Sequence, residues 1–189
     1  RLVWVGWAAV WGIADATARG SGRRGATVVA LALTSDPPRV IAVRDVCATA
    51  AVNRAFDIVD EEHGVDIAVC MPAVNVRKPI LAYTGDEFDR VVRVNLRGNF
   101  NVLQAAGRIM TTQRRGSIVL YSSIRSIVTE PGQSVYSMTK AGILQVAKTA
   151  APEWGTRGWR VDRVGPARAE PRAPPPQADN GNERKDNRQ

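Results

Sequence analysis

The sequence predicts an α/β fold built on a doubly wound parallel sheet. Short runs of β-branched and apolar residues alternate along the chain with longer amphipathic stretches, a pattern typical of successive strand–helix–strand units. Gly64 and Gly116 each stand between a predicted helix and the next predicted strand, where helix C-caps commonly lie. The hydrophobic content of 44% and charged content of 23% are ordinary for a globular domain of 189 residues.

Apolar runs of four or five residues define the strands, and helical spacing of apolar residues defines the helices. The predicted strands are Leu2–Val5, Thr27–Leu31, Arg39–Val43, Asp66–Cys70, Ser117–Tyr121 and Arg160–Val164. The predicted helices are Gly12–Arg23, Ala48–His63, Asp86–Met110 and Val135–Trp154. We expect the third helix to break near Gly98. Pro152 should kink or end the fourth, because proline lacks the N–H that an interior turn uses.

Two organisational features follow from composition. The stretch 33–40 leaves no room for a helix between the second and third strands, although parallel crossovers generally contain one. Residues 1–166 form one predicted domain, whereas residues 167–189 hold prolines and charges without a large apolar side chain. Such a segment cannot offset its ordering entropy by burial, so the sequence predicts a disordered tail.

Charge and cysteine content exclude several classes of function. The net charge is +8, but the 26 basic residues are scattered and aromatic residues make up only 6%, so we predict no nucleic-acid partner. No apolar run reaches the roughly 20 residues that a membrane helix needs, so we predict no membrane partner. Two cysteines do not form a disulfide framework, and we expect a reducing, cytoplasmic location. We predict no metal site.

A tyrosine–lysine pair carries the strongest chemical signal. Tyr136 and Lys140 are four positions apart, which places both side chains on one helix face. A neighbouring ammonium lowers the pKa of a phenol and suits it to general acid–base work. The alternative is an exposed helical pair without function. Ser122 and Ser123 favour chemistry, since they follow an apolar strand at the sheet edge where ligands bind. Asn95 lies inside the preceding helix, where an asparagine often bonds to its own backbone.

In the segments FDRVVRVNLRG, GSIVLYSSIRS and PGQSVYSMTKAG, the chain resembles the short-chain dehydrogenase/reductase family. The resemblance covers about residues 2–166 and implies a Rossmann-like sheet. It identifies Asn95, Ser123, Tyr136 and Lys140 with the family's catalytic tetrad. By resemblance, Tyr136 exchanges a proton with a small alcohol or carbonyl substrate and Ser123 orients the substrate oxygen. Lys140 lowers the pKa of Tyr136 and holds the nicotinamide ribose, and Asn95 anchors a relay water.

The resemblance also implies a nicotinamide cofactor, NADP or NAD. The residues expected to bind it are Gly6, Gly12, Ile13, Asp45, Val46, Tyr136, Lys140 and Pro166. Asp45 matches the position that contacts the adenine amino group, with a helix N-cap before Ala48 as its alternative role. The acidic residue by which the family selects NAD would fall at about Ala32 or Leu33, and neither is a carboxylate. Thr34, Ser35 and Arg39 suit a 2′-phosphate, which favours NADP slightly.

The sequence departs from the family in its cofactor contacts. The family's G-x-x-x-G-x-G turn keeps only one or two glycines, although a tight turn and close approach to pyrophosphate favour glycine. The family's Asn-Asn-Ala-Gly becomes Cys70-Met-Pro-Ala, in which Pro72 has no N–H to donate. Cys70 is expected to be a buried small hydrophobe. We expect the sheet to lack the family's last strand and substrate-binding helices.

Two hypotheses follow from these matches and losses. The first is an NAD(P)-dependent oxidoreductase that interconverts an alcohol and a carbonyl, with Tyr136 as general acid/base. The alternative is a catalytically inactive or truncated relative that acts as an interaction module or has no function. By resemblance, the helices around 86–110 and 135–151 pair subunits, which implies a homodimer or homotetramer.

Overall fold

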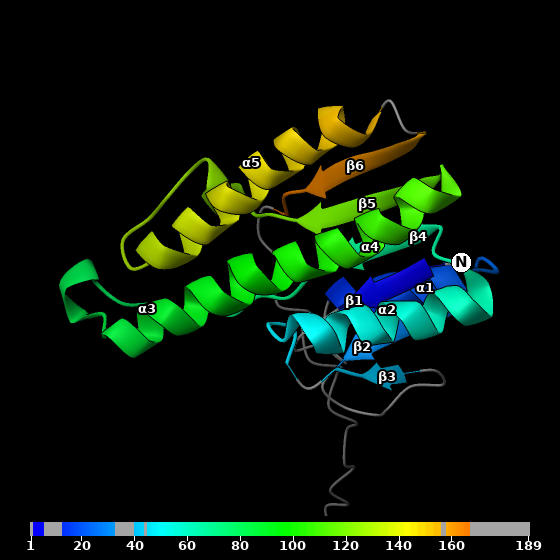
Figure 1. Ribbon diagram of the computed structural model, residues 1–189. Coiled ribbons are helices and arrows are strands. Elements are labelled where there is room, and N and C mark those ends of the chain that lie inside the picture. The colour runs from blue at the N-terminus through cyan, green and yellow to red at the C-terminus, as the bar shows by residue number, and fades with distance from the viewer. Residues whose placement is uncertain (1, 6–12, 33–39, 44, 156–157, 167–189) are drawn as a thin grey trace, which may run out of the picture.

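A computed structural model describes residues 2–5, 13–32, 40–43, 45–155 and 158–166 (Figure 1). Its strands are β1 (Leu2–Val5), β2 (Val28–Ala32), β3 (Val40–Ala42), β4 (Ile67–Cys70), β5 (Gly116–Tyr121) and β6 (Trp159–Val164). Its α-helices are α1 (Ile13–Gly22), α2 (Thr49–His63), α3 (Gly85–Val92), α4 (Asn99–Gln113) and α5 (Ser134–Gly155). Short 3₁₀ helices, η1 (Ile80–Ala82) and η3 (Ile124–Ser126), precede α3 and α5.

The strands form one parallel sheet in the order β3-β2-β1-β4-β5-β6, which confirms the predicted fold class. β1 pairs with β2 on one side and with β4 on the other. Strands β2 and β3 therefore extend the sheet on one side of β1, and strands β4 to β6 extend it on the other, so the strand order reverses between β1 and β4. In open α/β sheets, ligands bind at the carboxyl ends of the strands beside such a reversal. The topology therefore places the candidate site at the ends of β1, β4 and β5.

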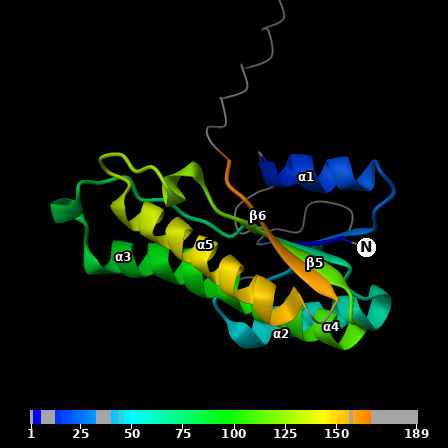
Figure 2. The same cartoon turned by 90° about the horizontal axis from the view of Figure 1, so that it is seen from above.

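Helices cover both faces of the sheet. α1 lies on one face, whereas α2, α4 and α5 cover the other (Figure 2). The main core fills the space between the sheet and this second group of helices, and its largest fully buried side chains include Phe56, Leu103, Met110, Ile118 and Leu120. Side chains in a strand alternate between faces, so Ile118 and Leu120 of β5 both point into this core. Each such side chain stabilises the fold by about 1.5–3 kcal/mol.

The third predicted helix is continuous rather than broken. α3 passes through a single π-helical turn, Arg93–Gly98, directly into α4. We call this segment the π-turn. Gly98 lies at its end and allows close packing, since a Cβ there would stand 2.7 Å from Val46 Cγ1. Gly98 therefore allows the helix to pack closely against Val46, and it does not interrupt the helix.

The sequence predicts that Pro152 kinks or ends its helix. Pro152 lies inside α5 and does not end it, because the helix continues to Gly155. The last turn is held by a tertiary contact. Trp154 stacks on Trp159 of β6, with ring centroids 4.4 Å apart and an interplanar angle of 22°. An aromatic pair of this kind contributes about 0.5–1.5 kcal/mol beyond area burial, which offsets part of the cost of the missing N–H.

Several predictions concern residues outside the described ranges. These are the glycine turn with Gly6 and Gly12, the crossover at 33–39 with Thr34, Ser35 and Arg39, and the tail 167–189. Within the ranges that the structure describes, none of the helices has the length and hydropathy required to cross a bilayer.

Candidate active site

Two serines at the carboxyl end of β5 have different roles. Ser122 is buried, and its hydroxyl donates to the main-chain carbonyl of Lys140 at 2.9 Å, which fastens α5 to the sheet edge. Ser123 begins η3 in an extended conformation, and its Oγ accepts the Arg125 N–H at 3.2 Å. The Ser123 hydroxyl also acts on the side chain of Tyr136, whose pKa it lowers. The structure thus singles out Ser123 as the serine that faces the predicted tyrosine.

Tyr136 and Lys140 lie on successive turns near the start of α5, as predicted from their spacing. The Lys140 ammonium lies 5.6 Å from the centroid of the Tyr136 ring. Lys140 is only 3% exposed, and its Nζ donates to the Tyr121 carbonyl at 2.8 Å. This burial lowers the pKa of Lys140 to about 8, because removal from water disfavours the charged form. The pair is therefore not the exposed helical pair that was the alternative.

The pKa of Tyr136 differs from the sequence-based expectation. Burial raises it above the ordinary value of 10, and the hydrogen bond from Ser123 opposes that rise only in part. The Lys140 ammonium, which lies 5.6 Å from the ring centroid and donates to the Tyr121 carbonyl, does not bring the pKa of Tyr136 below 10. At neutral pH the phenol is therefore protonated and can donate a proton.

Asn95 occupies the π-turn and is fully buried. Its Oδ1 accepts the Val74 N–H at 2.7 Å, and its Nδ2 donates to the Val74 carbonyl and to Thr139 Oγ1, both at 3.0 Å. The Thr139 hydroxyl donates to the Tyr136 carbonyl at 2.8 Å. The alternative, in which the Asn95 side chain bonds to its own backbone, is therefore wrong. The side chain joins the loop after β4 to the helix that carries Tyr136.

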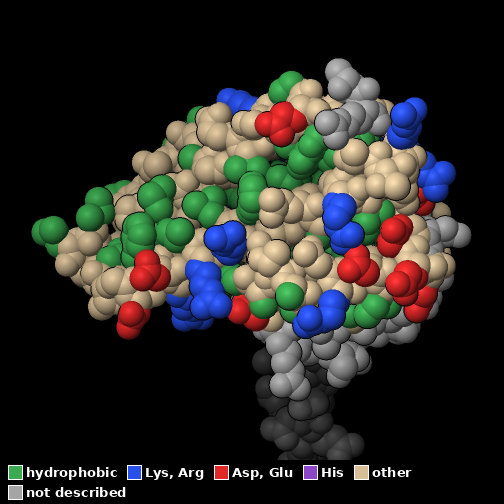
Figure 3. Space-filling view, viewed as in Figure 1, with side chains coloured by type: hydrophobic (Ala, Val, Ile, Leu, Met, Phe, Trp, Pro, Cys, Tyr) green, Lys and Arg blue, Asp and Glu red, His purple; other side chains and the backbone are tan. Residues whose placement is uncertain are grey.

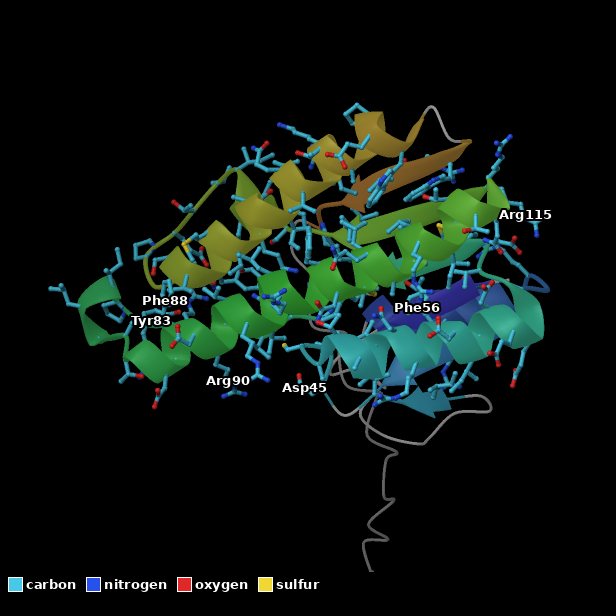
Figure 4. The ribbon with its side chains drawn as sticks, viewed as in Figure 1. Asp45, Phe56, Tyr83, Phe88, Arg90 and Arg115 are labelled. Carbon is cyan, nitrogen blue, oxygen red and sulfur yellow. The ribbon has the colours of Figure 1, made fainter. Side chains whose placement is uncertain are left out.

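Asp45 and Val46 follow β3 on the neighbouring part of the sheet edge. Asp45 accepts the Cys47 N–H at 2.8 Å and pairs with Arg93 at 2.7 Å. The alternative role of Asp45 as the N-cap of α2 is wrong, since that position is Ala48, which makes no side-chain cap. Figure 4 shows Asp45 between Arg90 of α3 and the start of α2. Val46 is buried against the π-turn.

The remaining predicted positions are placed as follows. Pro166 lies beside the candidate site, because its carbonyl accepts the Ile124 N–H at 3.1 Å. Ile13 is the first residue of α1, whereas Gly6 and Gly12 lie outside the described ranges. Cys70 is fully buried as expected, and burial raises the pKa of its thiol. In the described part of the chain, no group of three or more His, Cys, Asp or Glu side chains could hold a metal ion.

Sequence reasoning missed three buried polar residues of the site. Thr139 links Asn95 to Tyr136, and Gln133 accepts the Asn75 amide at 3.0 Å. Asn99 donates from Nδ2 to the carbonyls of Pro72 and Asn95 at 2.8 and 2.7 Å. The spacing of four between the two asparagines placed them on one helix face, so a signal for Asn99 was present in the sequence.

The family assignment rests on a match along most of the chain. Residues 6–185 match the model of a short-chain dehydrogenase/reductase family described as enoyl-(acyl carrier protein) reductase. The chain belongs to the short-chain dehydrogenase/reductase family. This membership confirms the resemblance and agrees with the parallel sheet and with the order of Asn95, Ser123, Tyr136 and Lys140 along it.

Curated relatives and solved structures agree with this family. The chain is 31% identical over 122 residues to a 3-oxoacyl-[acyl-carrier-protein] reductase of Rickettsia prowazekii, covering 65% of this chain and 51% of the relative. A protein of the same name from Thermotoga maritima is 34% identical over 116 residues, with 61% and 47% covered. The chain thus spans about half the length of the curated relatives it matches.

Among solved structures, NAD⁺-bound xylitol dehydrogenase superimposes with a TM-score of 0.82 at 25% identity, covering 89% of this chain and 71% of that one. A 4-hydroxyisoleucine dehydrogenase, solved with NADH and succinate, gives a TM-score of 0.78 at 24% identity, with 87% and 78% covered. The second likeness shows the fold alone. Both support the Rossmann-like architecture inferred from the strand order.

Proposed function

We propose that this chain carries the site of an NAD(P)-dependent oxidoreductase that interconverts a small-molecule alcohol and a carbonyl. The observation that supports this most directly is the buried Lys140 ammonium, which lies 5.6 Å from the centroid of the Tyr136 ring, on the residue whose pKa the Ser123 hydroxyl lowers. Membership of the short-chain dehydrogenase/reductase family supports the same reaction class. A reducing, cytoplasmic location is part of the proposal, in keeping with Cys47 and Cys70 as free thiols.

The residues of the chain would move one proton. In the direction of reduction, Ser123 donates a hydrogen bond to the substrate carbonyl oxygen, and Tyr136 transfers its phenolic proton to that oxygen. A bound nicotinamide supplies the hydride to the carbonyl carbon. The carbonyl becomes an alcohol, and Tyr136 becomes a phenolate that Lys140 stabilises until a proton returns. The raised pKa of Tyr136 suits reduction, because the proton is already in place at neutral pH.

The donors at the sheet edge suit a nicotinamide ribose. An ammonium has three N–H donors, and the Tyr121 carbonyl takes one from Lys140. The remaining donors are chemically matched to ribose hydroxyls, and Tyr136 lies on the same helix face. We propose NADP in preference to NAD, because neither Ala32 nor Leu33, where an NAD-selecting carboxylate is expected, is acidic. Asp45, Val46 and Pro166 are the proposed contacts toward the rest of the cofactor.

One observation favours the alternative of an inactive relative. Both carboxylate oxygens of Asp45 are engaged within the chain, one by the Cys47 N–H and the other by Arg93. An adenine amino group would have to compete with these partners. The ion pair is exposed on the Arg93 side, and exposed pairs are worth about 0–1 kcal/mol, so the competition costs little. We therefore prefer the oxidoreductase.

Titration with NADH and NADPH tests the proposal. Binding should be followed by nucleotide fluorescence and by the midpoint of thermal unfolding in the same samples. At 100 times the Kd, a ligand specific for the folded state stabilises it by about 2.7 kcal/mol, which raises Tm by about 5–10 °C for a chain of this size. Absence of binding of either nucleotide at millimolar concentration, by protein shown to be folded, would overturn the oxidoreductase and support the inactive relative.

Tyr136→Phe provides the control for chemistry. The variant keeps the ring beside Lys140 but removes the proton that reaches the substrate. Turnover should fall about 10²–10⁴-fold, the usual contribution of a positioned acid, while nucleotide affinity stays within twofold. A variant that turns over as fast as the parent would show that Tyr136 is not the proton donor.

We also propose a homodimer, or a homotetramer built from it, through α4 and α5. An apolar groove of about 430 Å³ lies between these helices, lined by residues that include Leu96, Phe100, Leu103, Ile143 and Val146. Hydrophobic side chains gather on this face in Figure 3. Phe100 is 41% exposed there and is the natural position to introduce a charge. Phe100→Glu should yield a monomer by light scattering at micromolar concentration, and a monomeric parent protein would refute the proposed pairing.

A further inference from the structure

Two asparagines, one helical turn apart, bind the backbone of the loop after β4. Asn95 uses its side chain on both backbone groups of Val74, and Asn99 donates to the carbonyl of Pro72 at 2.8 Å. Three backbone groups within three residues of this loop are thus bound from one helix. The loop leaves the carboxyl end of β4, next to the strand-order reversal, so its position bears directly on the candidate site.

The loop depends on these outside partners because its own sequence supplies few. Pro72 is buried, lacks an N–H, and is followed by Ala73, so neither residue offers a side-chain donor or acceptor. A buried backbone carbonyl left without a partner destabilises the fold. Asn99 supplies the partner to the Pro72 carbonyl from a side chain that is only 1% exposed.

The second bond of Asn99 connects the loop to the tyrosine. Its Nδ2 also donates to the main-chain carbonyl of Asn95 at 2.7 Å, which fixes the π-turn from which the Asn95 side chain projects. That side chain bonds to Thr139, and Thr139 bonds to the Tyr136 carbonyl. A continuous series of hydrogen bonds therefore runs from Pro72 to the helix turn that presents Tyr136.

One atom of the Asn99 side chain reduces the stability of the fold. The Oδ1 atom is buried and has no hydrogen-bond partner within the described part of the chain. Leucine, of similar size, would remove that unpaired acceptor but would also release the carbonyls of Pro72 and Asn95. An amide at this position therefore favours the placement of the loop over maximal stability, in the way that polar groups at functional sites commonly do.

We propose that Asn99 is a positioning residue for the nucleotide-facing loop 71–74 and, through Asn95 and Thr139, for Tyr136. The inference rests on the proposed oxidoreductase function for its effect on nucleotide binding. Its structural part, the placement of the loop, holds independently of that function. Asn99 itself touches neither the hydroxyl of Tyr136 nor that of Ser123, so its effect is transmitted through the backbone groups that it binds.

The test compares Asn99→Leu with a matched control on the same helix. Gln113 ends α4 and binds the backbone of Val65 as Asn95 binds that of Val74, with its Oε1 accepting the N–H at 3.2 Å and its Nε2 donating to the carbonyl at 2.9 Å. Val65 lies before β4, at the opposite end of that strand. Gln113→Leu therefore removes another side-chain amide of α4 that binds loop backbone, far from the candidate site.

Two readouts decide the proposal. In Asn99→Leu, hydrogen–deuterium exchange of the Val74 amide should accelerate at least tenfold, and the Kd for NADPH should rise at least tenfold. In Gln113→Leu, urea unfolding should begin at lower concentration, while the Val74 amide and the Kd keep their parent values. Equal exchange at Val74 in Asn99→Leu and the parent would overturn the positioning role. If exchange of the Val74 amide accelerates in Asn99→Leu but the Kd for NADPH does not change, the proposed role of Asn99 in nucleotide binding is overturned.

The same experiment separates this inference from the proposed function. Failure of the parent protein to bind any nucleotide defeats the oxidoreductase, and the exchange comparison still decides whether Asn99 holds the loop. If Asn99→Leu fails to fold, Asn99→Ser provides the test instead. Its side chain is smaller, and its hydroxyl is too short to bond to both carbonyls. Asn99→Ser should show the same acceleration at Val74, and parent-like exchange in a folded Asn99→Ser would refute the proposal.

Discussion

Gly98→Ala and Gly142→Ala form a pair that tests how the π-turn is packed. In each case the new methyl group meets one side chain at nearly the same distance. A Cβ on Gly98 would lie 2.7 Å from Val46 Cγ1, and a Cβ on Gly142 would lie 2.8 Å from Leu96 Cδ2. Distance alone therefore predicts equal effects, whereas the ability of the neighbour to move predicts different ones.

Val46 cannot yield easily. It is 2% exposed, it is β-branched and so stiff at χ1, and its other two side-chain carbons lie 3.5 and 3.6 Å from the same position. Overpacking of such a site costs about 1–3 kcal/mol. Alanine recovers up to about 1 kcal/mol of helix propensity relative to glycine. Gly98→Ala should therefore lower the free energy of unfolding by about 0–2 kcal/mol.

Leu96 has room to move. Its methyl groups are the far end of a flexible side chain, and it lines the open groove between α4 and α5. A change of rotamer removes the contact at small cost, and the helix-propensity gain of about 1 kcal/mol remains. Gly142→Ala should therefore match the parent or exceed its stability by up to about 1 kcal/mol.

Urea unfolding followed by circular dichroism measures both variants. The two should differ by about 1–3 kcal/mol, which is a difference in Tm of roughly 2–12 °C for a chain of this length. Light scattering must show the same assembly state for all three proteins, because the groove near Leu96 belongs to the proposed subunit contact. Equal stability of the two variants, or a more stable Gly98→Ala, would refute the reasoning from neighbour mobility.

Three further predictions follow from buried groups. The pKa of Lys140 is about 8 in the folded chain and about 10.4 in the unfolded chain. Between these pH values the unfolded chain binds more protons than the folded chain, so the free energy of unfolding should rise with pH from about 8 to about 10.4. Urea titrations at several pH values should show this slope in the parent and not in Lys140→Met. Iodoacetamide should label Cys47 before the fully buried Cys70 in folded protein, and labelling of both at equal rates by mass spectrometry would contradict the burial. Trp159→Phe should cost less than about 1 kcal/mol, because it removes the unpaired buried Nε1, whereas Trp159→Ala should cost about 3–5 kcal/mol in urea unfolding.

The strands were largely predictable because the signal for each is local. Apolar runs marked all six strands, and the α-helices were found within a few residues of their observed outer limits, whereas the short helices η1 and η3 were missed. The errors lie where distant contacts override a local preference. Local preference predicts a helix break at Gly98, but the close packing of Val46 there explains why a glycine is needed inside the helix. Local preference also allows Pro152 to end its helix, but the stacking of Trp154 on Trp159 holds the turn that follows it.

The candidate site shows the same division. The spacing and order of Ser123, Tyr136 and Lys140 were visible in the sequence, and these residues do come together. The pKa of Tyr136 was not predictable, because it depends on burial and on where the Lys140 ammonium points. The pairing of Asp45 with Arg93 joins residues 48 positions apart, which no local pattern indicates.

The central position of β1 has a consequence for how the chain folds during synthesis. β1 is the first strand, yet one of its two edges pairs with β4, where Leu2 lies opposite Ile67. At a translation rate of about 5–20 residues per second, roughly 3–13 s pass between synthesis of these two positions. During that interval β1 has no partner on its β4 side, and an open strand edge is prone to aggregation. The middle of the sheet is therefore completed late, and we expect the nascent chain to be most dependent on chaperones before β4 leaves the ribosome.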